Sequence, residues 1–312
     1  MILCVTLNPC LDKTLTVPTW KVGDSVRGVS IREVVGGKGN NVARALKRLG
    51  RSARPVTFLG GSVGATCRAL LKEVDDLDPI AVETQAPTRV ILTVLTQGTT
   101  DQTAFFDPDP QIRPDEAAAL LARVEDALAG PDVEALTLSG SSPSATTHEL
   151  YSDMIGLARA RRVPVFLDTY GPALEGIWGF WPTVIQLNRR EAAGQLRKST
   201  VTDADVLGLL SDWGRRGVKC SIVTNGPDPV LIQYGDRTYR AAPPAIEVVN
   251  PIGSGDSMLA GLVDGWLTGG DPETILRHAI ACASANASVW DAGAVDPEIV
   301  RRLEQEFKLE PI

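Results

Sequence analysis

Residues 250–261 read Asn-Pro-Ile-Gly-Ser-Gly-Asp-Ser-Met-Leu-Ala-Gly, and the rest of the chain is best understood by working outward from this stretch. A largely apolar run over residues 246–249 precedes it and predicts a strand. Apolar residues at helical spacing follow over 258–267 and predict a helix. The order strand, glycine-rich turn and helix is typical of α/β proteins.

Gly253 and Gly255 bracket the turn, so the backbone can approach a ligand without an intervening Cβ. The first N–H groups of the following helix have no helical partner and favour an anion. Asp256 adds a carboxylate beside them. Phosphoryl transfer to a hydroxyl needs both parts, because amides stabilise the charge of the moving group and a carboxylate accepts the hydroxyl proton. The same residues also fit an ordinary helix start, so the turn alone leaves both interpretations open.

Composition disfavours several classes of protein. The chain has 312 residues, of which 44 % are apolar and 22 % charged, enough for one large α/β domain or two smaller ones. Its net charge is −7 and it has no basic run, which disfavours binding to nucleic acid or a membrane surface. Without a bilayer-spanning apolar run or a signal-like N-terminal segment, we expect a cytoplasmic protein.

Cysteine and histidine usage disfavours two kinds of site. The five cysteines are Cys4, Cys10, Cys67, Cys220 and Cys282. They are scattered and show no CxxC spacing, so we expect buried free thiols rather than disulfides or a zinc site. The two histidines, His148 and His278, each fall in a predicted helix, where a surface or packing role is expected. His-based triads and His-rich metal sites are therefore disfavoured.

Strand-like and helix-like segments alternate after Arg51, which predicts parallel strands joined by helical crossovers, with helices on both faces of the sheet. The predicted strands are 1–7, 55–59, 135–139, 163–168, 183–188, 220–225 and 230–234. The predicted helices are 65–74, 114–129, 146–161, 203–216 and 272–289. Several strands end in polar residues that would share one rim of such a sheet. These strand ends are 139–141, Asp168, Asn188 and 224–226.

Two further segments, 14–35 and 89–106, alternate apolar and polar residues, as half-exposed strands do. The second reads as a hairpin around Gly98. Together they predict a small sheet that stands off the main one. Such a sheet could be a lid, an edge extension or a dimer contact, and two of these roles can hold together.

Two more features near the N-terminus are weak signals by themselves. Asp12 follows the first strand, where it could contact a ligand or form an Asx-turn beside Pro9. Residues 36–41, Gly-Gly-Lys-Gly-Asn-Asn, form a second glycine-rich loop that leads into a predicted helix. Its spacing matches neither a Walker-type phosphate loop nor GxGxxG, so a dinucleotide fold is not indicated.

The chain resembles the ribokinase-like (PfkB) carbohydrate kinases over essentially its whole length, most closely the branch with 1-phosphofructokinase, tagatose-6-phosphate kinase and the minor 6-phosphofructokinase. The motifs that carry the resemblance are TLNPCLD at 6–12, GGKGNNVARAL at 36–46, SGSSP at 139–143, LNRRE at 187–191, TNG at 224–226 and GSGDSMLAGL at 253–262. The resemblance implies a single domain over 1–312 with a central, mostly parallel sheet and helices on both faces. It also implies a β-sheet lid from approximately 13–35 and 88–107, and a homodimer through the lid.

The resemblance further implies phosphorylation, by ATP with Mg²⁺, of a hydroxyl on fructose 1-phosphate, tagatose 6-phosphate or fructose 6-phosphate. It implies Asp256 as the base, with anion-hole amides from Gly253, Ser254 and Gly255. The sugar-binding positions are Asp12, Gly37 and Asn41, with Lys38 close by, and those for the substrate's phosphate are Arg27, Arg89 and Ser141. The nucleotide positions are Asn188, Thr224, Gly226 and Gly255, and Glu191 with Asn188 acts on magnesium through water. A monovalent-cation requirement is left open.

These roles suit the residue types. Carboxylate and amide groups can replace the water that solvates a neutral sugar, and arginine binds a phosphate bidentately. A closing lid would exclude water, which competes as phosphoryl acceptor.

Some positions depart from the family pattern. Asn250-Pro251-Ile252 precede the turn, Gly-Ser-Gly replaces Gly-Ala-Gly, and Pro229 stands where the nucleotide loop usually ends in glycine. A proline there removes an N–H that could face a phosphate. Residues 103–107 lack the additional arginine often found on the second lid strand.

Two alternatives stay open. One is a kinase of an unphosphorylated sugar or a nucleoside, with Arg27 and Arg89 as solvated charges. The other is a non-catalytic sugar- or nucleotide-binding protein on the same scaffold.

Overall fold

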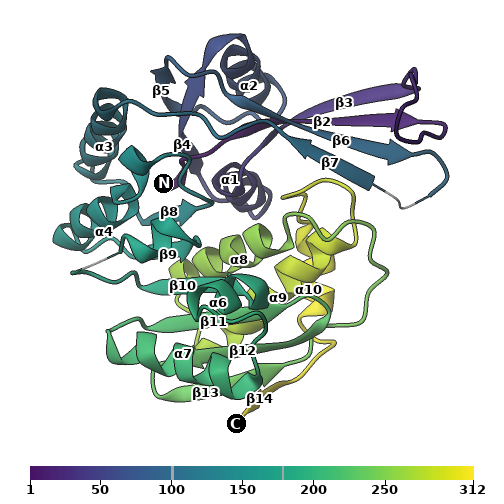
Figure 1. The fold of residues 1–312 in the computed structure, drawn as a ribbon. Coiled ribbons are helices and arrows are strands. Elements are labelled where there is room, and N and C mark those ends of the chain that lie inside the picture. Colours follow the sequence, from purple (N-terminus) through teal and green to yellow (C-terminus); the bar gives the residue numbers. More distant parts are fainter. Residues whose placement is uncertain (100–101, 178) are drawn as a thin grey trace.

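The computed structural model describes residues 1–99, 102–177 and 179–312 and arranges them in two sheets with helices around the larger one (Figure 1). Within the described residues, the larger sheet has the strand order β14-β13-β12-β11-β10-β9-β8-β1-β4-β5. Its strands are β1 Ile2–Thr6, β4 Ala53–Gly60, β5 Ile80–Thr84, β8 Ala135–Ser139, β9 Val165–Asp168, β10 Val184–Asn188, β11 Cys220–Asn225, β12 Asp228–Tyr234, β13 Arg237–Ala241 and β14 Leu309–Pro311. The run from β5 to β11 is parallel, and β12 to β14 pair antiparallel, which confirms the predicted mostly parallel sheet.

Helices cover both faces of this sheet, as predicted. They are α1 Lys38–Arg48, α2 Gly61–Glu73, α3 Pro114–Leu128, α4 Leu150–Ala160, α5 Pro172–Glu175, α6 Arg189–Gln195, α7 Asp203–Arg215, α8 Ser254–Thr268, α9 Pro272–Ala287 and α10 Pro297–Leu303. Two apolar cores separate on the two faces, and β1 contributes to both. Ile2 and Cys4 join the core under α1, α8 and α9, whereas Leu3 and Val5 join the core under α3, α4 and α7. This alternation explains why β1 is apolar throughout.

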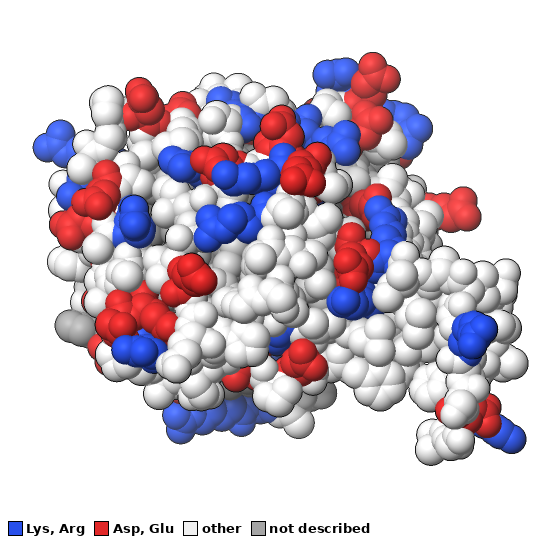
Figure 2. Space-filling view, turned by 90° about the horizontal axis from the view of Figure 1, so that it is seen from above, with Lys and Arg blue, Asp and Glu red and all other residues white. Residues whose placement is uncertain are grey.

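The small sheet has the order β3-β2-β6-β7 and projects from one side of the molecule (Figure 1). Its strands are β2 Cys10–Val17, β3 Ser30–Gly36, β6 Arg89–Thr96 and β7 Gln102–Phe106. Residues 100 and 101 of the expected hairpin lie outside the described residues. Seen from above, Lys and Arg are interspersed with Asp and Glu, and the projecting part on the right carries few of either (Figure 2).

The apolar run 246–249 does not form the expected strand. Pro243 and Pro244 lie just before it and supply no N–H for a ladder. Val249 and Asn250 instead donate their N–H groups to the carbonyl of Ala287, at 2.9 and 3.2 Å. The run is thus irregular backbone held against the end of α9.

Other differences concern element ends and short elements. The helix expected at 146–161 is split into a 3₁₀ turn, Ala145–Thr147, and α4, so His148 lies between them rather than in a helix. The helix expected at 65–74 already starts at Gly61. Strands β5, β13 and β14 and helices α5, α6 and α10 were not expected, because each is short and its periodicity weak.

The expectation of buried free thiols is borne out. All five cysteines are buried and free. In the described part of the chain, every helix is too short or too polar to cross a bilayer.

Candidate active site

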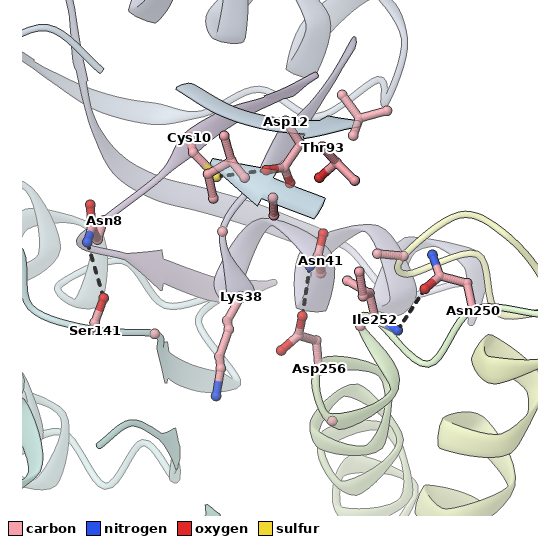
Figure 3. Close-up of a pocket in the computed structure, with 18 of the residues that line it drawn as sticks. Asn8, Cys10, Asp12, Lys38, Asn41, Thr93, Ser141, Asn250, Ile252 and Asp256 are labelled. Atoms are coloured by element: carbon pink, nitrogen blue, oxygen red, sulfur yellow. Dashed lines mark hydrogen bonds between the residues drawn. The ribbon is translucent and has the colours of Figure 1, made fainter. Parts of the chain in front are cut away.

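A cavity of about 490 Å³ lies between the small sheet, the start of α1, the carboxyl ends of β9 to β11 and the start of α8. Asp12 of the small sheet and Asp256 of α8 both line it, and Figure 3 shows them facing this space from opposite sides. The structure therefore brings the two acids into one cleft. The other expected site residues that line it are Gly37, Lys38, Asn41, Arg89, Ser141, Asn188, Glu191, Thr224, Gly253 and Gly255.

Three expected residues do not line this cavity: Arg27, Ser254 and Gly226. Arg27 is exposed in the irregular segment between β2 and β3. Gly226 is an exposed turn residue between β11 and β12. Ser254 is the first residue of α8, and its N–H is directed at the carbonyl of Pro251, 3.3 Å away. The free donors of this helix start are therefore expected from Gly255 and Asp256.

Gly253 precedes α8 in the left-handed conformation, with φ of 83°. A Cβ there would lie 2.6 Å from the Cβ of Ala292, so both conformation and space require glycine. At Gly255 an added Cβ would lie 3.5 Å from Nε2 of Gln186, an ordinary contact. The first glycine thus shapes the turn, and the second leaves the cavity open.

Asp256 is buried, with 5 % of its surface exposed, and its Oδ2 accepts a 2.7 Å hydrogen bond from Nδ2 of Asn41 (Figure 3). Burial raises the pKa of this carboxyl to about 7, and the negative charges of Asp168 and Glu191 add to the rise while Lys38 and Asn41 oppose it. A carboxylate with a pKa near neutral pH is well suited to act as a general base.

Lys38 begins α1, after Gly37 as N-cap, and its side chain reaches the end of β9 and the start of α6. Its Nζ lies 2.7 Å from Oδ1 of Asp168 and 3.1 Å from Oε1 of Glu191. Burial opposes the ammonium charge, but these carboxylates and Asp256 outweigh it and raise the pKa of Lys38. A permanent cation therefore stands among three acids.

Asp12 lies on β2, paired with Val34 of β3 and Ile91 of β6. The thiol of Cys10 donates a 3.3 Å hydrogen bond to its Oδ1. Burial raises the pKa of Asp12, against the hydrogen bond from Cys10 and the charges of Arg89 and Arg44. The carboxylate can accept hydrogen bonds from hydroxyl groups of a ligand on the cavity side of the small sheet.

Arg89, Asn8 and Ser141 form a polar corner of the cavity. Nη1 of Arg89 lies 3.0 Å from Oδ1 of Asp109, and Nδ2 of Asn8 donates to that same oxygen at 2.8 Å and to Oγ of Ser141 at 3.1 Å. Nε of Arg89 and Oδ1 of Asn8 are buried and have no hydrogen-bond partner among the described residues. Unpaired buried polar atoms beside a cavity fit a polar ligand group.

Asn188 and Glu191 are tied together at the start of α6. Oδ1 of Asn188 accepts from the N–H of Glu191, and Oε2 of Glu191 accepts from the N–H of Asn188, both at 2.9 Å. Burial raises the pKa of Glu191, against the charge of Lys38. Thr224 lines the cavity from the end of β11, while Pro229 lies within β12, outside this cavity.

The carboxylates around Lys38 could hold a hydrated divalent cation such as magnesium. Among the described residues, no cluster of three His, Cys, Asp or Glu side chains could enclose a metal. Magnesium commonly keeps several waters and uses one or two carboxylates with substrate phosphates, so Asp168 and Glu191 suffice. The buried Oε1 of Gln186, which lacks a partner within the described ranges, adds an acceptor on the same side.

The expected residue set missed Asp168, Gln186, Asn8 and the pair Arg32–Asp291. Asp168 was signalled as a polar strand end but received no role. Gln186 lies inside an apolar strand and donates to the carbonyl of Gly255 at 2.8 Å, a contact that no local pattern indicates. Nη2 of Arg32, on the small sheet, lies 2.6 Å from Oδ1 of Asp291, across the cavity mouth.

A family model described as pfkB family carbohydrate kinase matches residues 5–298 of this chain. The chain therefore belongs to the pfkB family and is a carbohydrate kinase of that family.

Among the solved structures that are similar over nearly the whole chain, three illustrate the range. A possible 1-phosphofructokinase from Thermotoga maritima has a TM-score of 0.89 at 23 % identity, covering 100 % of this chain and 99 % of its own. Phosphofructokinase-2 from Escherichia coli, in complex with potassium, has a TM-score of 0.88 at 24 % identity, covering 97 % of each chain. Ribokinase from Arabidopsis thaliana, complexed with ribose and ATP, has a TM-score of 0.73 at 19 % identity, covering 97 % and 98 %. At these identities the likeness shows the ribokinase-like fold.

Proposed function

We propose that the protein transfers the γ-phosphoryl group of ATP, bound with magnesium, to a hydroxyl of a hexose phosphate. Fructose 1-phosphate is the first candidate, followed by tagatose 6-phosphate and fructose 6-phosphate. The observation that carries the proposal is the placement of Asp256, a buried carboxylate at a helix start, in one cleft with Asp12. One group can hold the sugar while the other takes its proton.

In the proposed reaction, Asp12 and Asn41 bind sugar hydroxyls and aim one of them at Asp256. Asp256 accepts the hydroxyl proton as the oxygen attacks the γ-phosphorus and the bond to ADP breaks. The N–H groups of Gly255 and Asp256 and the ammonium of Lys38 stabilise the negative charge of the moving phosphoryl group. Asp168, Glu191 and Asn188 would hold a magnesium ion through water, and the ion would supply positive charge to neutralise the phosphates.

A phosphate on the acceptor would occupy the corner formed by Arg89, Asn8 and Ser141. The unpartnered Nε of Arg89 supports this assignment, because a buried guanidinium nitrogen gains most from a charged acceptor. Arg27 keeps its part in phosphate binding from the family resemblance alone.

A second candidate is a kinase of an unphosphorylated sugar. The observation that favours it is Asp109, whose carboxylate already neutralises Arg89 at 3.0 Å. Turnover of fructose against fructose 1-phosphate, in wild type and in Arg89→Ala, separates the two. A phosphorylated substrate predicts that Arg89→Ala raises KM for the sugar phosphate alone.

We extend the proposal to a homodimer formed through the small sheet, which would then act as a lid, and to activation by potassium. Leu15 and Ile31 are cross-strand neighbours on the face of this sheet that points away from the cavity, and Ile31 is 58 % exposed. Phe105 on the same face is 51 % exposed, so the face presents apolar side chains to a partner, next to the ion pair Lys13–Glu33. Light scattering tests the dimer, and turnover in potassium against tetramethylammonium tests the cation.

The deciding experiment for the base is Asp256→Asn, assayed by coupled ADP release over a sugar-phosphate panel. We expect kcat to fall by about 10²–10⁴-fold while sugar binding, measured by calorimetry, persists. Asp271→Asn is the matched control, because Asp271 is the exposed N-cap of α9 and asparagine caps a helix equally well. Wild-type turnover by Asp256→Asn would contradict the assignment, and binding without turnover in wild type would favour the non-catalytic alternative.

A further inference from the structure

Asn41 makes two opposite hydrogen bonds with its side-chain amide. Its Nδ2 donates to Oδ2 of Asp256 at 2.7 Å, and its Oδ1 accepts from Nη1 of Arg44 at 2.8 Å. An amide can present a donor or an acceptor to a given neighbour, depending on the rotation about its last bond. Arg44 can only donate, so it holds the oxygen of Asn41 on its own side and the NH₂ group toward Asp256.

The guanidinium of Arg44 is itself fixed from several directions. Its Nε and Nη2 bind the two carboxylate oxygens of Asp75 at 2.8 and 2.7 Å, a bidentate arrangement. Nη2 also donates to the carbonyl of Val35, at the base of the small sheet, and Nη1 to that of Ala292. Its side chain is 15 % exposed and that of Asp75 is 12 % exposed. With the guanidinium held in this way, Nη1 is directed at Asn41.

The backbone around this contact is also tightly packed. A Cβ on Gly293 would lie 2.7 Å from the carbonyl oxygen of Asn41 and 3.1 Å from the Cβ of Arg44. The loop that carries Ala292 therefore presses on α1 at the same turn of helix. Neither Arg44 nor Asp75 lines the cavity, so any effect they have on the substrate passes through another residue.

The orientation of Asn41 matters because its neighbour is an acid. With the NH₂ group toward Asp256, the carboxylate gains a donor; with the oxygen toward it, two acceptors would repel each other. Lys38, Asp168 and Glu191 are the other charged groups that act on Asp256, and none of them contacts the amide of Asn41 in the described part of the chain. Asn41 is thus the uncharged hydrogen-bond donor that fixes the orientation of the Asp256 carboxylate.

We propose that Arg44, held by Asp75, is a positioning residue of the phosphoryl-transfer reaction: it fixes the amide orientation of Asn41 and, through it, the carboxylate of Asp256. This inference rests on the proposed function, because it takes Asp256 as the base. Arg44 would thus influence the reaction without lining the cavity, because its contact Asn41 does line it.

A double-mutant cycle tests the relay. Arg44→Gln is expected to lower kcat about ten- to hundredfold, the size of one lost hydrogen bond to a charged group, with KM for ATP unchanged. In an Asn41→Ala background, the same substitution is expected to change kcat less than threefold, because the hydrogen bond through which Arg44 acts is gone and only the effect of its charge on Asp12 is left. Effects that multiply in the double variant would overturn the proposal.

Asp75→Asn separates positioning from stability. It removes the charge of the pair but keeps an amide oxygen that can accept a hydrogen bond from Arg44, so Nη1 of Arg44 should still face Asn41. We therefore expect a lower midpoint of unfolding with nearly wild-type kcat. If Arg44 were merely structural, Asp75→Asn and Arg44→Gln would lower kcat equally for equal losses of stability, which would overturn the proposal. Should Arg44→Gln fail to fold, Arg44→Lys replaces it. A lysine ammonium can pair with Asp75, but it cannot also reproduce the guanidinium geometry that directs Nη1 at Asn41.

A measurement without turnover completes the test. The side-chain NH₂ signals of Asn41, assigned in ¹⁵N spectra by their loss in Asn41→Ala, should keep their shifts in Asp75→Asn and move in Arg44→Gln or Arg44→Lys. Unmoved signals in the Arg44 variants would overturn the relay. If Asp256→Asn turns over like wild type, the proposed base fails instead. An inactive Asp256→Asn together with multiplying Arg44 and Asn41 effects leaves the base standing and removes the relay.

Discussion

The ammonium of Lys38, in the first turn of α1, lies 2.7 Å from the carboxylate of Asp168 at the end of β9, although 130 positions separate the two residues. Asp168 is 3 % exposed, and a buried carboxylate is costly to leave without a partner. The pair places a cation at the rim of the sheet beside the helix start that carries Asp256.

Replacing Lys38 should lower kcat more than it weakens substrate binding. We expect Lys38→Met to lower kcat by about 10²–10³-fold, because one donor to the moving phosphoryl group is lost. The substitution also leaves Asp168 and Glu191 without their cation. Lys38→Arg keeps the charge and is the matched control, expected to retain more activity. Steady-state kinetics measures both, and equal kcat values for Lys38→Met and wild type would remove Lys38 from the reaction.

The rate should rise with pH through about 7. Burial raises the pKa of Asp256 to about 7, so the carboxyl is mostly protonated at pH 6 and cannot accept the hydroxyl proton, whereas at pH 8 it is mostly ionised. Asn41→Ala removes a hydrogen bond that lowers this pKa, so its acid limb should move to higher pH. Profiles of kcat/KM between pH 5 and 9 measure both, and a limb below pH 5 in wild type would contradict the assignment.

The two glycines of the turn should respond differently to alanine. Gly253→Ala places a side chain at φ of 83° and 2.6 Å from Ala292, so we expect a loss of about 1–2 kcal/mol in stability together with lost activity. Gly255→Ala should keep or slightly raise stability, because alanine favours a helix by about 1 kcal/mol, yet its methyl group enters the cavity and lowers kcat. Urea unfolding and kinetics test the pair, and equal stability losses would contradict it.

His278 of α9 should stabilise the fold most at neutral to acidic pH. Its ring nitrogens lie 2.8 Å from Asp264 and 2.6 Å from Glu304, which join α8 and the end of α10 to α9. Burial opposes the imidazolium charge, but the hydrogen bonds to Asp264, Cys282 and Glu304 raise the pKa of His278 to about 11. Its stabilisation is therefore complete below the ordinary value of 6.5 and declines as pH rises toward 11.

We accordingly expect His278→Gln to cost about 2 kcal/mol of unfolding free energy at pH 6 and less at pH 9.5. Urea titrations at the two pH values measure the difference. His148→Gln is the control, since His148 lies in the bend before α4. A cost for His278→Gln that grows with pH would contradict the raised pKa.

The ion pair Arg32–Asp291 should affect the position of the small sheet more than stability. Its side chains are 50 % and 47 % exposed, so the pair adds little to stability. Asp291→Ala is expected to raise KM for the sugar a few-fold, because the small sheet would lose a tie across the cavity mouth. The charge exchange Arg32→Asp with Asp291→Arg should restore KM, and an unrestored value would mean that the residues act separately.

The sequence allowed a mostly parallel sheet with helices on both faces to be predicted, because each crossover has its own periodicity and each strand is apolar over a few residues. The glycine-rich turn before α8 could also be recognised, because apolar residues at helical spacing follow it. The strand predicted at 246–249 was wrong. The apolar pattern does not take into account that Pro243 and Pro244, just before this run, have no N–H to donate to a neighbouring strand. Arg27 matched a motif position, yet the chain leaves it exposed between β2 and β3.

Local patterns along the chain predicted the fold class, whereas the family resemblance implied site roles for Asp12 and Asp256. Such patterns could not pair Asn41 with Asp256, 215 positions away, or Arg44 with Asp75, because such contacts depend on how α1 packs against its neighbours. That packing also made Asp256 a buried acid with a raised pKa. The charge, burial and hydrogen-bond directions of the side chains at this site depend on tertiary packing, because segments far apart in the sequence supply the neighbours of Asp256 and Asn41.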